Sequence, residues 1–108
     1  MQSKEAIAAL LALGQNTRLD AYRLLLEQGS KGLRVTEISK RLDVNISTLS
    51  RHLGRLEQTG LLQSWRIERE IIYAVNDNGI QQLMNFLTEN CCRANPENCN
   101  WTDSSIKK

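Results

Sequence analysis

Several features that would place this sequence in a special class of protein are scarce. It has one proline and six glycines, too few for a linker or a low-complexity chain. No apolar run approaches the roughly 18 residues that span a bilayer, and the N-terminus, with Lys4 and Glu5 ahead of Ile7, does not resemble a secretion signal. We therefore expect a cytoplasmic protein without a membrane partner, whose three cysteines stay reduced.

The composition is that of an ordinary small globular protein. Its 108 residues suit one domain, and 41% of them are hydrophobic and 24% charged. A core of this size is modest, so a shared interface in a dimer would help to stabilise it. The net charge is only +2, but residues 31–69 hold eight basic and four acidic side chains, against six basic and eight acidic elsewhere. The middle of the chain is therefore the basic part.

Apolar residues at helical spacing predict helices at both ends of the domain. The first is expected to stop at Gly14, and the second to run from a cap at Asn16 or Thr17 to Gly29. A last helix is expected after the loop 76–79, ending between Glu89 and Cys92. The expected inner faces are Ile7, Leu10, Leu11 and Leu13; Leu19, Tyr22 and Leu26; and Ile80, Leu83, Met84 and Leu87.

The centre of the chain has the pattern of a helix-turn-helix. A short helix with Thr36 as its cap is followed by a three-residue turn, 43–45, and by a longer helix that Asn45 caps and Gly60 closes. The buried stripe expected on this longer helix consists of Ile46, Leu49, Leu53 and Leu56.

After Gly60 the apolar pattern alternates, which predicts a β-hairpin. Two alternating runs, 64–67 and 71–75, flank a charged tip at 68–70 that lacks the Gly or Asn favoured in tight turns. The predicted fold is mainly α with a small β-hairpin, a winged helix-turn-helix. Residues 1–92 are expected to form this domain, and 93–108 a tail with the third cysteine.

The outward face of the 46–59 helix and the hairpin tip carry side chains suited to DNA. Hydroxyls and guanidinium groups bind phosphates and base edges. The alternative for any one of these residues is a solvated surface position. His52 is the only histidine, so a metal role lacks partners, and a DNA contact competes with an undistinguished surface position. The candidate DNA contacts are Ser47, Thr48, Ser50, Arg51, His52, Arg55, Arg66 and Arg69.

All three cysteines, Cys91, Cys92 and Cys99, fall within nine residues. Thiolates are soft ligands that match soft acceptors such as trivalent arsenic or antimony. Such an ion takes three thiolates, whereas structural zinc prefers four ligands. A thiol redox switch and a zinc site remain open alternatives. The odd count and a reducing compartment argue against a structural disulfide.

The run 44–53, Val-Asn-Ile-Ser-Thr-Leu-Ser-Arg-His-Leu, followed by Leu-Glu-Gln-Thr-Gly-Leu-Leu at 56–62, resembles the ArsR/SmtB family of metal-sensing repressors, as does 16–19. The resemblance covers roughly residues 5 to 92. It implies a homodimer built from the first and last helices, with the 46–59 helix reading the major groove of double-stranded operator DNA.

The family's effector sites are only partly present in this sequence. The Cys-Val-Cys-Asp box of many members reads Arg-Val-Thr-Glu at 34–37, and the His/Asp pattern of zinc sensors is absent. The chain is similar instead to arsenite-responsive members with C-terminal cysteines. That likeness implies a repressor released when arsenite, As(III), or antimonite, Sb(III), binds Cys91, Cys92 and Cys99, with no organic cofactor.

Three competing interpretations differ in their chemistry. A redox-responsive or zinc-responsive repressor of the same fold would release DNA on oxidation or on zinc binding. A thiol enzyme would need a base or an anion-binding loop near its nucleophile, and neither surrounds Cys91. A constitutive architectural DNA binder would respond to no effector. We therefore predict that the chain is not an enzyme.

Overall fold

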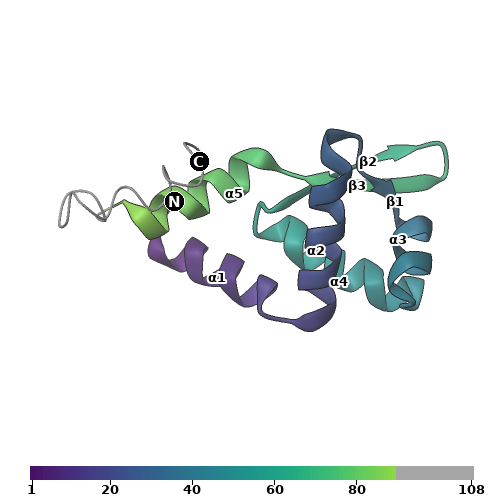
Figure 1. The fold of residues 1–108 in the computed structure, drawn as a ribbon, viewed down its shortest axis with the longest axis horizontal. Coiled ribbons are helices and arrows are strands. Elements are labelled where there is room, and N and C mark those ends of the chain that lie inside the picture. The colour runs from purple at the N-terminus through teal and green to yellow at the C-terminus, as the bar shows by residue number, and fades with distance from the viewer. Residues whose placement is uncertain (90–108) are drawn as a thin grey trace, which may run out of the picture.

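A computed structural model describes residues 1–89, which form five α-helices and a small antiparallel sheet (Figure 1). Figure 1 shows α1 and α5 together at one end, and α3 and the β2–β3 hairpin at the other. The predicted mainly helical fold with a hairpin is confirmed. The helices are α1 (Ser3–Leu13), α2 (Asn16–Gln28), α3 (Val35–Leu42), α4 (Ile46–Gln58) and α5 (Asp77–Thr88), with a 3₁₀ turn, η1 (Gly29–Lys31), after α2.

The sheet has three strands in the order β1–β3–β2. The hairpin strands β2 (Leu62–Ile67) and β3 (Glu70–Val75) were predicted, but β1 (Leu33–Arg34) was not. In the hairpin Ile67 pairs with Glu70, so the turn is only Glu68-Arg69. Glu68 takes the left-handed conformation, with φ 56°, that Gly or Asn usually supplies in such a turn.

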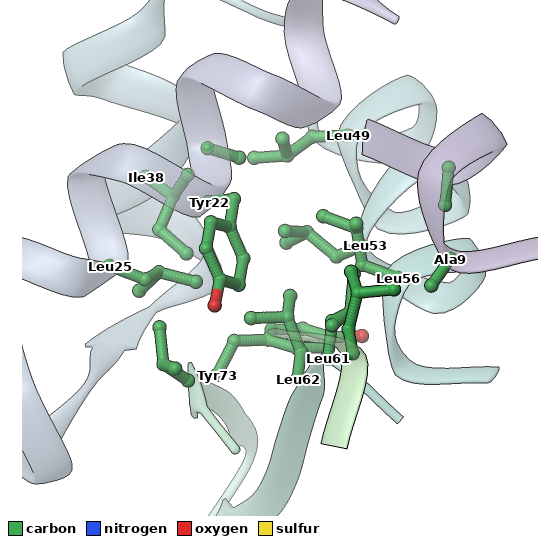
Figure 2. Close-up of a cluster of buried hydrophobic side chains, with 14 of the residues drawn as sticks. Ala9, Tyr22, Leu25, Ile38, Leu49, Leu53, Leu56, Leu61, Leu62 and Tyr73 are labelled. Atoms are coloured by element: carbon green, nitrogen blue, oxygen red, sulfur yellow. The ribbon is translucent and has the colours of Figure 1, made fainter. Parts of the chain in front are cut away.

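Helices α2 and α4 enclose the core together with the hairpin. Figure 2 shows Tyr22 in the middle of this cluster, with Leu25, Ile38 and Leu53 around it. The predicted stripe of α4 is confirmed at Leu49, Leu53 and Leu56, which are fully buried. The prediction that Ile46 is also buried is wrong, because 45% of its surface is exposed. This residue begins the helix, and helical side chains lean toward the N-terminus, so it extends past the end of the core.

The α1 helix meets the core through its small residues. Ala6, Ala9 and Ala12 are buried, whereas the expected inner residues Ile7, Leu10 and Leu11 are exposed. Alanines let this helix pack closely, and its larger side chains then face outward. The other exposed members of the expected inner faces are Leu19 and Leu26 on α2 and Met84 and Leu87 on α5.

The turn between α3 and α4 follows the sequence prediction. Asp43 takes the left-handed conformation, with φ 56°. Asn45 caps α4, because its side-chain oxygen accepts hydrogen bonds from the backbone of Ser47 at 2.8 Å and of Thr48 at 3.4 Å. These bonds satisfy donors that the first turn of a helix otherwise leaves free.

The other predicted caps are wrong. The cap position of α3 is Arg34, and the hydroxyl of Thr36 donates instead to Glu70 at 3.0 Å. Helix α2 is capped by the side chain of Gln15, not by Asn16 or Thr17. In each case a tertiary contact or a neighbouring amide took the place of the preferred local cap.

The start of α5 is fixed to the turn that follows α4. The helix begins at Asp77, within the predicted loop, because Asn76 caps it and accepts from the backbone of Asn78 at 3.2 Å. The backbone N–H of Asn76 donates to Leu61 at 3.0 Å. A Cβ atom on Gly79 would overlap the carbonyl of Gly60, so the two backbones touch where neither residue has a side chain. No helix among residues 1–89 is long and apolar enough to cross a membrane.

Candidate nucleic-acid interface

Helix α4 turns one face to the core and leaves the opposite face open. The buried leucines fix its rotation, and the predicted contact residues therefore lie outside the core. His52 is half-buried. The other predicted contacts on α4, which are exposed, are Ser47, Thr48, Ser50, Arg51 and Arg55.

These side chains do not form one flat surface. Ser47, Arg51 and Arg55 follow at intervals of four residues and so make a single row. Ser50 and His52 are one residue to either side of Arg51, rotated from it by about 100° in opposite directions. The interface on α4 is therefore a central row with one polar residue on each flank.

The cap of α4 limits what Ser47 can do. Its hydroxyl donates to the side-chain oxygen of Asn45 at 2.6 Å. Because a hydroxyl has a single hydrogen, Ser47 can only accept from a ligand while this bond is in place. Arg51 and Arg55 are the donors of the row.

His52 is held by an arginine from another helix. Arg18, in the first turn of α2, places Nη1 3.0 Å from Nδ1 of His52, and its Nε donates to the carbonyl of Ala12 at 2.6 Å. Burial lowers the pKa of His52 below its ordinary value of 6.5, and Arg18, Arg51 and Arg55 lower it further. The neutral imidazole is thus the favoured form.

No acidic side chain among the described residues forms an ion pair with the three arginines near His52. Within residues 1–89 the one ion pair is between Arg41 and Glu37 on α3, at 2.9 Å. Arg18, Arg51 and Arg55 line a hollow of about 420 Å³ together with His52 and Gln58. The arrangement concentrates positive charge beside hydrogen-bond donors, which suits a phosphate group.

Sequence reasoning missed two residues of this hollow, Arg18 and Gln58. Arg18 is separated from His52 by 34 positions, and no local pattern relates two residues so far apart. Gln58 follows Arg51 and Arg55 on α4 and could have been found from helical spacing.

The hairpin contributes the remaining predicted contacts. Arg66 on β2 and Arg69 in the turn are both exposed. Glu57 near the end of α4 accepts a hydrogen bond from the hydroxyl of Ser64 on β2 at 2.7 Å. This bond fixes the base of the hairpin to the helix that carries the arginine row.

The predicted thiolate site lies outside the described residues. Cys91, Cys92 and Cys99 all follow residue 89, as does the proposed boundary between 92 and 93. Within residues 1–89 no group of three His, Cys, Asp or Glu side chains could hold a metal ion.

Residues 13–64 match the family described as "Helix-turn-helix domain". A solved structure described as an ArsR-like transcriptional regulator from Rhodococcus sp. RHA1 has a TM-score of 0.73 at 22% identity, covering 87% of this chain and 86% of the other. This chain is a winged helix-turn-helix protein. The winged helix-turn-helix consists of α3, the 43–45 turn and α4, with β2 and β3 as the wing.

Relatives of this winged helix-turn-helix protein are regulators. It is 29% identical over 93 residues to the transcriptional activator HlyU of Vibrio cholerae, covering 86% of this chain and 83% of that protein. The structure of reduced HlyU has a TM-score of 0.64 at 27% identity, covering 83% and 92% of the two chains. A homodimeric winged helix-turn-helix domain from Mycobacterium bovis has a TM-score of 0.65 at 21% identity, covering 81% of each chain. Their descriptions agree with the prediction that the chain is not an enzyme.

Proposed function

We propose that this protein is a DNA-binding transcriptional regulator of the ArsR type, in which α4 reads the major groove. The observation that carries the proposal is the exposed row on α4, whose arginines have no acidic partner among residues 1–89. Guanidinium groups at such positions bind guanine edges and phosphates. Arg66 and Arg69 then contact the DNA beside the groove that α4 occupies.

The regulator acts as a homodimer through α1 and α5. These helices contact each other and leave large apolar side chains exposed: Leu11 is 69% exposed, Ile7 57% and Leu87 51%. Contiguous exposed apolar surface marks protein–protein interfaces among other contact sites, and the Mycobacterium bovis domain is described as homodimeric. Two copies of α4 would read two half-sites of a pseudo-palindromic operator.

The effector of the regulator is trivalent arsenic or antimony bound by Cys91, Cys92 and Cys99. Cys91 follows the last residue of α5, Thr88, by three positions, so a ligand there acts on the end of a helix whose first turn touches Gly60, two residues after α4 ends. A coupling free energy of about 1–3 kcal/mol would lower operator affinity roughly 5–150-fold. We propose that this release makes the protein a repressor.

A redox-responsive regulator is the second candidate, because one solved relative is described as the reduced form of HlyU. A thiolate cluster would serve that function through a disulfide, with an oxidant in place of arsenite. HlyU is described as an activator, so the same titration must also decide the direction of regulation.

The deciding experiment measures fluorescence anisotropy of a labelled duplex that the reduced protein has selected from a random pool. Arsenite, zinc and peroxide are added separately. Release by arsenite alone, lost in Cys91→Ser and blunted in Cys99→Ser, supports the arsenic-responsive repressor. Release by peroxide or zinc overturns the choice of effector, and tighter binding with arsenite overturns repression.

A matched pair of variants tests the DNA-reading face itself. Arg51→Ala should weaken binding to the selected duplex without changing arsenite affinity, whereas Arg23→Ala removes an exposed arginine of α2 and should leave both unchanged. If no duplex is selected, or if Arg51→Ala binds as the parent protein does, α4 does not read DNA as proposed.

A further inference from the structure

One arginine connects three helices. Arg18 belongs to α2, its Nε donates to Ala12 in the last turns of α1, and its Nη1 contacts Nδ1 of His52 on α4. Its own backbone N–H is held by the side chain of Gln15 at 2.8 Å. The guanidinium group is therefore held by α1, and the backbone of Arg18 by the cap of α2, independently of the contact with His52.

This contact determines where the proton of His52 lies. Arginine offers only N–H donors and does not lose its charge in proteins, so Nδ1 of His52 must accept. The neutral ring then carries its hydrogen on Nε2, the nitrogen that Arg18 leaves free. Protonating Nδ1 would set an N–H group against the guanidinium and break the bond. Burial of the ring opposes that protonation most, and Arg18 from α2 and Arg51 and Arg55 from α4 add to it.

We propose that Arg18 is a positioning residue that holds His52 as a neutral Nε2–H donor, and that this donor binds one phosphate of the DNA backbone in the hollow beside Arg51 and Arg55. The inference rests on the proposed function. The arginines provide charge, which attracts any phosphate nearby. A fixed N–H donor adds direction, which sets how α4 lies on the duplex.

Two other roles of Arg18 predict different results. If Arg18 only adds positive charge, its effect on DNA binding is independent of His52. If it only fastens α1 through Ala12, its loss changes stability and leaves the imidazole tautomer as it was. The hydrogen bond to His52 is the feature that separates these roles, and it can be observed directly.

The first test uses nuclear magnetic resonance of the imidazole nitrogens in the reduced full-length chain, which is unambiguous because the sequence has one histidine. We expect the Nε2–H tautomer in the parent protein and in Arg18→Lys, and a mixture of tautomers in Arg18→Met. Circular dichroism confirms that each variant is folded. An Nδ1–H tautomer in the parent protein, or an unchanged spectrum in Arg18→Met, overturns the proposal without any reference to DNA.

The second test is a double-mutant cycle on duplex binding, measured by anisotropy. His52→Gln keeps an N–H donor near the position of Nε2 but does not need Arg18 to fix a tautomer. Arg18→Met should weaken binding about tenfold when residue 52 is His and about threefold or less when it is Gln, a coupling typical of residues in contact. Equal losses in the two backgrounds overturn the positioning role.

Comparing two duplexes separates a phosphate from a base as the acceptor. The loss in Arg18→Met should be the same on the selected duplex and on one of unrelated sequence, because every duplex has the same backbone. A loss confined to the selected duplex overturns the phosphate contact. If the parent protein binds neither duplex, the proposed function fails, and the tautomer measurement still decides whether Arg18 positions His52.

Discussion

The hydroxyl of Thr36 donates a 3.0 Å hydrogen bond to the carboxylate of Glu70, and this bond joins α3 to the hairpin next to its turn. Glu70 opens β3 directly after the Glu68-Arg69 turn. The two residues are 34 positions apart and both are partly buried. The orientation of the wing relative to the helix-turn-helix is thus fixed near its tip as well as at its base.

Thr36→Val should destabilise the protein by about 0.5–1.5 kcal/mol, the net contribution of a typical hydrogen bond. The substitution keeps the shape of the side chain but removes the donor. Urea unfolding followed by circular dichroism measures the change. Thr36→Ser retains the hydroxyl and should stay close to the parent protein. Equal stability of the Val and Ser variants would show that this bond does not hold the wing.

Asn45→Ala should cost about 1 kcal/mol of stability, because the cap accepts from the backbone of Ser47 and Thr48. The same loss should loosen the first turn of α4 and weaken duplex binding. Asn45→Ser keeps an uncharged side-chain oxygen as acceptor and serves as the control in both measurements. Comparable unfolding of the Ala and Ser variants would argue that the side chain is not the cap.

Two glycines in helices should respond to alanine with opposite signs. Gly79→Ala places a Cβ atom on the backbone of Gly60 and should destabilise the protein, because neither backbone can move without shifting a helix. Gly54→Ala on α4 meets nothing within 4 Å and should stabilise it by about 0.5–1 kcal/mol through helix propensity. Thermal unfolding of both variants decides the matter, and a stabilised Gly79→Ala would contradict the close contact.

His52 should make stability depend on pH. Its pKa in the folded chain lies below the ordinary value of 6.5, chiefly because of burial and then because of Arg18. The unfolded chain therefore binds a proton first as the pH falls, so this contribution is present above pH 6.5 and is lost as the pH drops through the lowered pKa. Urea unfolding at pH of about 7.5 and about 5.5 should show a larger loss in the parent protein than in His52→Gln. The same loss in both would remove His52 as the cause.

Leu11→Lys should convert the proposed dimer into a monomer, because it places a charge in the apolar surface of α1 and α5. Sedimentation velocity measures the change in mass. Leu26→Lys alters a comparably exposed leucine on α2, 51% exposed, and should leave the dimer intact. If both variants sediment as the parent protein does, the dimer forms through another surface.

Local patterns predicted the elements of this fold better than their contacts. The leucines of α4 are spaced so that one face is apolar and the other polar, and this contrast identified both the helix and its outward residues. On α1 both faces are apolar, so periodicity shows which residues share a face but not which face meets the core. The larger residues were expected inside, and the alanines are there instead.

Features that depend on distant partners were not predictable from the sequence. Strand β1 has only two residues, and it is a strand because Leu33 and Arg34 pair with β3. Arg18 belongs to the run 16–19, which contributes to the resemblance to the ArsR/SmtB family. Its contact with His52, however, exists only because α2 and α4 lie side by side. The cap of α3 failed for the same reason, since Thr36 reaches across to the hairpin.

The contact between Gly60 and Gly79 fixes one end of α5. It lies at the start of the helix, where the two backbones touch. Thr88 lies nine residues beyond Gly79, which at 1.5 Å per residue is an arm of about 14 Å. The turn that ends α4 lies at this contact, so a change in the tilt of α5 would reach the reading helix through backbone atoms and not through adjustable side chains.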